Sequence, residues 1–149
     1  MEGNIIVDNE LKRTIILDNY QEPKNRGIPS NKEDYIKINS NNQSCIDNID
    51  IYIKLNNNVI EDIKYEGEAC VIAISSTSIL SDLLIGKTKE EAINILNNYY
   101  SMIEEKEYKE DILKEATVYN DIYKQPSRKT CATLFARGIS GFFENNNVK

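Results

Sequence analysis

The sequence predicts a single α+β domain: an N-terminal helix, a three-stranded antiparallel sheet, and then a helical half packed on one face of the sheet. Three observations support this prediction. Isoleucine and leucine alternate with other residues over positions 49–55, which is typical of a half-buried strand. Strand-like segments flank it at 35–38 and 59–66, whereas after residue 70 the apolar residues recur at helical spacing. The length of 149 residues fits one domain over 1–149, with a core from about 9 to 143 and frayed termini.

Caps and turn residues place the elements of the N-terminal half. A helix is expected from about residue 9 to 20, with Asp8 or Asn9 as its N-cap. Two prolines and a glycine within residues 23–29 then break the chain. The asparagines at 56–58 suit a hairpin turn between the second and third strands, because asparagine tolerates positive φ.

The third strand leads into the helical half. Gly67 supplies the break that lets the chain turn, and a buried helix is expected from Val71 to Ile85, with Gly86 as its left-handed cap. A capping box at Thr88–Glu91 opens the next helix. One or two short helices are expected within residues 111–123.

The last helix is expected to begin at Ser127, which follows a proline and can act as its N-cap. Cys131 then lies in its first turn, as Cys70 does at the start of the earlier buried helix. A thiol in a first turn lies near unpaired N–H groups and the positive end of the helix dipole, and both favour the thiolate.

Composition narrows the classes of function. A net charge of −6 without a dense lysine or arginine cluster argues against a nucleic acid partner. No apolar run approaches the roughly 20 residues of a membrane span, and the N-terminus lacks the basic start of a secretory signal, so a cytoplasmic protein is expected. The absence of histidine excludes Ser-His-Asp and Cys-His catalysis and histidine-based metal sites. Three cysteines without an export signal favour metal ligation or sulfur chemistry over a disulfide framework.

The three cysteines occupy related places in the expected fold. Cys45 lies in the loop between the first two strands, Cys70 between the third strand and a helix, and Cys131 at a later helix start. These connections can meet at one end of the sheet, where Asp47 would complete a Cys₃Asp set suited to tetrahedral Zn²⁺. Spacing alone leaves open a second interpretation, in which they are three unrelated core cysteines.

Five motifs carry a family resemblance. In chain order they are Leu17-Asp-Asn-Tyr20 with Pro23-Lys-Asn-Arg-Gly27, Asn42-Gln-Ser-Cys45-Ile-Asp47, Val59 to Cys70, Ser75 to Ser78, and Arg128-Lys-Thr-Cys131-Ala-Thr-Leu134. Together they resemble the SufU/IscU family of iron–sulfur cluster assembly proteins, over about residues 9 to 143. Thr130 stands where the IscU branch has a histidine, and the long segment between Cys70 and Cys131 resembles the SufU insertion, so the resemblance is to the SufU branch.

The resemblance implies a zinc-binding, sulfurtransferase-like protein that acts with a PLP-dependent cysteine desulfurase of the SufS type. It would accept persulfide sulfur from that enzyme and pass it on, with a downstream iron–sulfur scaffold as a further partner. The zinc ligands implied are Cys45, Asp47, Cys70 and Cys131, with Arg128 as a contact at the site rim or with the partner. Cys45 is expected to be the persulfide acceptor, because it lies on a loop and is not anchored in a helix.

Two other functions stay open from the sequence. One is a scaffold that builds a transient iron–sulfur cluster on the same cysteines, and the other is a non-catalytic, zinc-stabilised domain that only binds the desulfurase. The chain also departs from the family pattern at Ile46 and Ala69, where glycines are usual. If either position required positive φ, the substituted residue would be strained.

Overall fold

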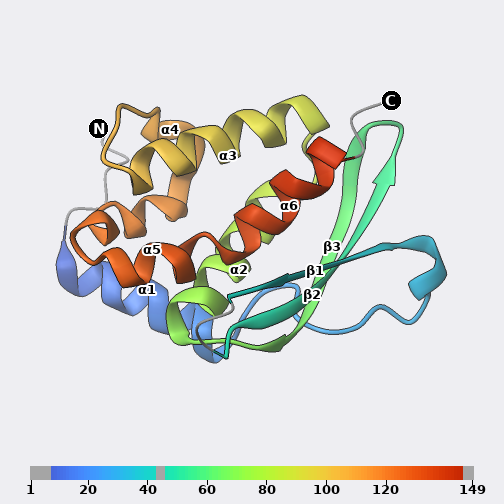
Figure 1. Ribbon diagram of the computed structural model, residues 1–149, viewed down its shortest axis with the longest axis horizontal. Helices are drawn as coiled ribbons and strands as arrows, with labels where there is room; N and C mark the ends of the chain where they lie inside the picture. The colour runs from blue at the N-terminus through green and yellow to red at the C-terminus, as the bar shows by residue number, and fades with distance from the viewer. Residues whose placement is uncertain (1–7, 43–45, 146–149) are drawn as a thin grey trace.

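The computed structural model describes residues 8–42 and 46–145, and it has the predicted α+β architecture (Figure 1). One helix precedes an antiparallel sheet of strand order β1-β2-β3, and the other α-helices follow the sheet. The elements are α1 (Asn9–Gln21), η1 (Lys32–Asp34), β1 (Ile36–Asn41), β2 (Asn48–Asn56), β3 (Val59–Glu68), α2 (Val71–Leu84), α3 (Lys89–Ile103), α4 (Glu110–Leu113), η2 (Lys114–Tyr119), η3 (Ile122–Lys124), α5 (Pro126–Ala132) and α6 (Leu134–Asn145).

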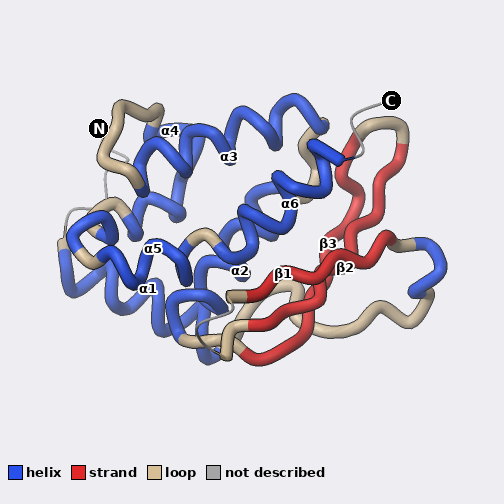
Figure 2. The backbone as a smooth tube through the Cα atoms, viewed as in Figure 1, coloured by secondary structure: helices blue, strands red, loops and turns tan. Residues whose placement is uncertain are grey.

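The helical half covers one face of the sheet, as predicted. Figure 2 shows the helices gathered on one side of the three strands. Helix α6 contacts β1 and β2, and α2 contacts β3. On the covered face the central strand presents Ile49, Ile51 and Ile53, which are buried. Helix α2 also contacts α1, α5 and α6, so it runs through the centre of the core.

The β2–β3 hairpin forms where the asparagines predicted it. Asn57 and Asn58 both have positive φ, at 52° and 70°, and Asn56 pairs with Val59 across the turn. Gly67 has a different role from the one predicted. Its φ is +144°, but it lies inside β3 opposite Ile49, and an added Cβ would lie 2.3 Å from a main-chain oxygen of β2. The glycine is therefore required by close approach of two strands and not by a turn.

The caps of α1, α2 and α3 are those that the sequence predicts. Asp8 caps α1, and Gly86, with φ +92°, follows the C-cap of α2. Thr88 and Glu91 form the capping box of α3, in which each side chain accepts a hydrogen bond from the other residue's backbone N–H. These signals are local, so they operate independently of the rest of the fold.

The last helix differs from the prediction, because it is two helices. Gln125 is the N-cap of α5, and Pro126 takes the first helical position, so Ser127 is not the cap. The helix then breaks at Thr133, whose hydroxyl donates to the Lys129 carbonyl at 2.8 Å, four residues back. Such back-bonding bends helices.

Within the described residues, no helix is long and apolar enough to cross a membrane.

Candidate metal centre

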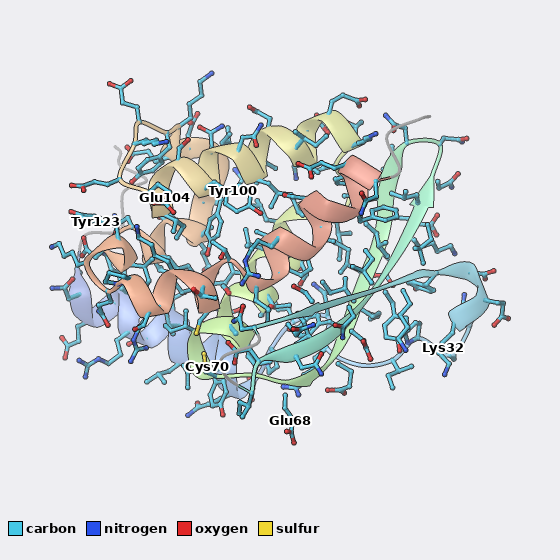
Figure 3. The ribbon with its side chains drawn as sticks, in the orientation of Figure 1. Lys32, Glu68, Cys70, Tyr100, Glu104 and Tyr123 are labelled. Atoms are coloured by element: carbon cyan, nitrogen blue, oxygen red, sulfur yellow. The ribbon has the colours of Figure 1, made fainter. Side chains whose placement is uncertain are left out.

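The structure brings together three of the four predicted ligands. The ligand atoms of Asp47, Cys70 and Cys131 all lie within 4.8 Å of one another. They come from the segment before β2, the start of α2 (Figure 3) and the end of α5. Cys45, the fourth predicted ligand, lies outside the described residues. The described thiols therefore converge, which disfavours the interpretation that they are unrelated core cysteines.

Asp47 lies at the base of the group, with only 1% of its surface exposed. One carboxylate oxygen, Oδ1, accepts the backbone N–H of Cys70 at 2.9 Å, and the other, Oδ2, accepts the side-chain amide of Asn42 at 2.9 Å. The Cys70 thiol lies 3.8 Å from Oδ2. A buried carboxylate needs such donors, because burying it without hydrogen-bond partners would lower the free energy of unfolding. Asp47 thus joins the segment before β2 to the start of α2.

Cys70 is the N-cap residue of α2, close to its predicted place in the first turn. Its carbonyl accepts the Ile74 N–H at 2.9 Å, which is the first hydrogen bond of the helix. Its side chain makes no capping hydrogen bond. The half-buried sulfur instead faces Asp47 and Cys131 at the positive end of the helix dipole.

Cys131 does not lie in a first helical turn, so the prediction for its position is wrong. It is the penultimate residue of α5, because the helix starts at Pro126 and breaks at Thr133. Burial raises the pKa of the Cys131 thiol, and the adjacent Cys70 thiol and Asp47 carboxylate raise it further. The thiolate is therefore disfavoured in the protein without a cation, contrary to the prediction from a helix dipole. A metal ion would reverse that balance.

The break between α5 and α6 frees backbone carbonyls on both sides of Cys131, and side chains satisfy them. Arg137 donates to the Thr130 carbonyl at 2.7 Å. Tyr99, fully buried on α3, donates its hydroxyl to the Ala132 carbonyl at 2.8 Å. Buried carbonyls without a partner would destabilise the fold, so these bonds hold the backbone around Cys131 in place.

Three further residues named from the sequence lie near the group. Arg128 is exposed on α5, one turn before Cys131, which suits a contact at the site rim. Ile46 is 72% exposed. Neither Ile46 nor Ala69 has positive φ, so the strain considered for these departures from the family glycines does not arise.

Sequence reasoning missed the residues that support the ligands. Asn42 opens one of the quoted motifs, but its contact with Asp47 was not foreseen. Arg137 lies in an apolar stretch of α6 and has no recognisable signal, and the same is true of Tyr99 within the stripe of α3. Their roles depend on tertiary contacts between distant segments.

The donor set defines the chemistry available. Two thiols and one carboxylate supply three of the four ligands of a tetrahedral zinc ion, and zinc accepts both ligand types. The burial of Asp47 and the raised pKa of Cys131 both indicate that these groups are more stable beside a cation than alone.

Comparison with known proteins places the chain in a family. Residues 11–132 match the model of the NifU-like N-terminal domain. The zinc-dependent sulfurtransferase SufU of Bacillus subtilis (strain 168) is 35% identical over 125 residues, 83% of each chain. The iron–sulfur cluster assembly scaffold protein IscU of Streptococcus pyogenes serotype M1 is 32% identical over 127 residues, 85% of this chain and 78% of that one.

A solved structure agrees with this placement. The SufU-type scaffold protein of Fervidobacterium islandicum AW-1 superposes with a TM-score of 0.78 at 29% identity, covering 85% of this chain and 91% of that one. The matched region includes Asp47, Cys70 and Cys131. The chain therefore belongs to the NifU-like N-terminal domain family, which includes the SufU and IscU iron–sulfur cluster assembly proteins.

Proposed function

We propose that this protein is a zinc-dependent sulfur carrier for iron–sulfur cluster assembly, which accepts persulfide sulfur from a PLP-dependent cysteine desulfurase of the SufS type. The observation that supports this most directly is the convergence of Asp47, Cys70 and Cys131 within 4.8 Å. The relative with 35% identity is a zinc-dependent sulfurtransferase. The proposal places the protein in the cytoplasm, with a downstream iron–sulfur scaffold as the recipient of the sulfur.

In this proposal Cys45, Asp47, Cys70 and Cys131 hold Zn²⁺. The ion would supply the positive charge that keeps the thiols deprotonated and arranged. Asp47 contributes a buried carboxylate that is already oriented by Cys70 N–H and by Asn42. Arg128, exposed near Cys131, would contact the desulfurase.

Cys45 is the proposed acceptor, because Cys70 and Cys131 are held at the ends of helices α2 and α5, whereas the sequence predicts Cys45 in a loop. Its thiolate would attack the terminal sulfur of the desulfurase persulfide. A sulfur–sulfur bond forms on Cys45 while the one in the desulfurase breaks, and the desulfurase cysteine leaves as a thiolate. The exchange therefore needs no external oxidant or reductant.

The experiment that tests this proposal is intact-mass spectrometry after incubation with a SufS-type desulfurase and L-cysteine. We expect a gain of about 32 Da for each transferred sulfur, reversed by a thiol reductant. A chain that binds the desulfurase but gains no mass would instead be a non-catalytic binding domain.

A cluster scaffold is the second candidate, since relatives at 32% identity are IscU scaffold proteins. The two functions differ in the metal that the protein carries when purified without oxygen. About one zinc per chain supports the sulfur carrier, whereas iron with acid-labile sulfide supports the scaffold. The absence of histidine, which leaves Thr130 before Cys131, favours the carrier.

A further inference from the structure

A chain of hydrogen bonds leads from the surface of α6 to the candidate metal centre. Arg137 donates from Nη2 to the side-chain oxygen of Asn42 at 2.6 Å. Asn42, only 6% exposed, donates from Nδ2 to the Asp47 carboxylate at 2.9 Å. Arg137 itself is exposed and is not one of the grouped ligands.

This chain fixes the orientation of the Asn42 amide. A guanidinium group has only hydrogen-bond donors, so the carbonyl end of the amide must face Arg137. The amino end must then face Asp47, where it donates to Oδ2. The amino group also lies 3.4 Å from the Thr130 carbonyl, so Arg137 reinforces an orientation that these two acceptors already favour and fixes the position of the carbonyl end.

Asn42 and Asp47 also enclose the segment that contains Cys45. The Asn42 backbone N–H donates to the Asp47 carbonyl at 2.9 Å, and their side chains form a second bond. The two ends of the segment are therefore joined twice. A change of the Asn42 side chain removes the second of these bonds and leaves the first.

Arg137 connects this loop to Cys131. The same guanidinium nitrogen that holds Asn42 donates to the carbonyl of Thr130, the residue before Cys131, at 2.7 Å. Its Nε donates to the Thr133 hydroxyl at 3.1 Å. One side chain thus bonds both the segment that carries Asp47 and the helix end that carries Cys131.

We propose that Arg137, acting through Asn42 and the Thr130 carbonyl, is a positioning residue that sets Asp47 and Cys131 at the separation needed to bind a metal. This inference rests on the proposed metal-binding function. Residues that orient metal ligands change metal affinity by about 10–100-fold when they are replaced. Because Arg137 is exposed, its replacement leaves no buried cavity, so the cost to folding is limited to its hydrogen bonds with Asn42, Thr130 and Thr133.

The test compares Arg137→Gln, Asn42→Ala and the double variant with a matched control, Arg13→Gln, which makes the same charge change at an exposed position on α1. Zinc affinity is measured by competition with a chromophoric chelator of known affinity. Each single variant is expected to bind zinc about 10–100-fold more weakly than the wild type. The double variant is expected to lose less affinity than the sum of the two single losses, because the two residues share one hydrogen-bond path while each also makes a contact of its own. The control is expected to match the wild type.

Cobalt provides a readout that a purely structural role would not change. Co²⁺ takes the place of Zn²⁺, and its visible d–d absorption reports the geometry of its ligands. The bands are expected to shift in both Arg137→Gln and Asn42→Ala, whereas the thermal midpoint of the metal-free protein is expected to fall more in Asn42→Ala, which leaves the buried Asp47 carboxylate with one donor fewer. Arg137→Lys keeps the charge but loses the two-pronged donor, so it is expected to restore the affinity only partly.

The outcomes separate the two proposals. If the wild type binds one zinc, and Arg137→Gln binds it equally tightly and gives the same cobalt spectrum, the positioning role alone is overturned. A loss of affinity explained fully by a lower thermal midpoint of the metal-free variant also overturns it. A wild type that binds neither zinc nor cobalt overturns the metal-binding function and the positioning role with it.

Discussion

At the scale of single residues, Asp47 links the candidate metal centre to the backbone of the fold. Its carboxylate accepts the Cys70 N–H at the start of α2 and the Asn42 amide, and it is buried. Even without a metal, a carboxylate in this position accepts the hydrogen bond of the Cys70 N–H and so stabilises the start of α2. Changes at Asp47 therefore affect the stability of the metal-free protein as well as metal binding.

Asp47→Asn is expected to lower the free energy of unfolding of the metal-free protein by about 1–3 kcal/mol. Asparagine has the same shape, but it offers one acceptor atom where two donors converge, so one donor loses its partner. Urea denaturation measures the change. Asp18→Asn, at an exposed position of α1, is the control and is expected to stay within about 0.5 kcal/mol. Equal stability of both variants would show that Asp47 acts only as a ligand.

Cys45→Ala separates the acceptor from the other ligands. It is expected to abolish the mass gain from the desulfurase while keeping part of the zinc affinity, because Asp47, Cys70 and Cys131 remain. Cys70→Ala and Cys131→Ala are expected to lose more zinc affinity, since their sulfurs are held in the described group. Zinc competition and intact mass measure the two effects. If Cys45→Ala still accepts sulfur at the normal rate, Cys131, near Arg128, is the better candidate for the acceptor.

At the scale of elements, the predictable features are those fixed by short stretches of sequence. The Thr88 capping box and the hairpin at Asn57 and Asn58 depend on neighbouring residues only, and both were predicted correctly. The break at Thr133 was missed, because continuing the helix and breaking it are both compatible with the local sequence. The tertiary bonds from Tyr99 and Arg137 to the freed carbonyls favour the break.

The same distinction applies to the candidate site. The residue types and their order predicted which ligands would meet, and the structure brings Asp47, Cys70 and Cys131 together. The pKa of Cys131 was expected to be lowered, whereas burial raises it. The causes are burial and the adjacent Cys70 and Asp47, which depend on tertiary packing and not on the position of Cys131 in its helix.

Two glycines on α6 are expected to respond in opposite directions to alanine. A Cβ on Gly141 would meet nothing within 4 Å, so Gly141→Ala is expected to stabilise the protein by about 0.5–1 kcal/mol through helix propensity. A Cβ on Gly138 would lie 3.0 Å from Ile51 and 3.1 Å from Ser40 of the sheet. Gly138→Ala is therefore expected to destabilise by about 1–3 kcal/mol. Thermal unfolding measures both, and a stabilising Gly138→Ala would show that α6 can move away from the sheet.

At the scale of the whole molecule, the metal centre ties together parts of the chain that are far apart in sequence. Its described ligands come from the β1–β2 connection, α2 and α5. A second connection joins α1 to the turn between η2 and η3, where the buried Lys12 donates to Asn120 at 2.6 Å and pairs with Asp121 at 3.0 Å. Both sets of contacts are therefore expected to contribute to global stability.

Removal of the metal is expected to lower the stability of the whole domain. A ligand that binds only the folded state stabilises it by about 4 kcal/mol when present at 1,000 times its dissociation constant. For a chain of this size that corresponds to a fall of about 8–16 °C in the unfolding midpoint. Calorimetry with and without a chelator measures it. A midpoint unchanged by chelation, in protein shown to have lost its zinc, would indicate that the ion does not hold the segments together.

Three buried tyrosines contribute to the response of the fold to alkaline pH. The hydroxyls of Tyr65 and Tyr99 donate to the backbone carbonyls of Lys24 and Ala132, each at 2.8 Å, and the Tyr119 hydroxyl lies 2.5 Å from that of Ser75. Burial is the main cause that raises the pKa of each tyrosine above its usual 10. The folded protein therefore keeps these three protons at pH values where the unfolded chain loses them.

The stability of the metal-free protein is consequently expected to fall as pH rises above about 9, where the unfolded chain first loses the Cys131 proton that the folded protein keeps, and to fall more steeply above pH 10, where the tyrosines follow. Each tyrosine that stays protonated only in the folded state lowers the free energy of unfolding by about 1.4 kcal/mol per pH unit. The pKa values of Tyr35, Tyr100 and Tyr108 are also raised, so the slope is expected to exceed the roughly 4 kcal/mol per unit of the three buried tyrosines alone. Urea denaturation at pH 9, 10 and 11 measures this slope. Tyr119→Phe removes one titrating group, and it is expected to reduce the slope by about 1.4 kcal/mol per pH unit relative to the wild type. An identical slope in the two proteins would mean that Tyr119 ionises as readily in the folded state as in the unfolded chain, and that the core around Ser75 admits water.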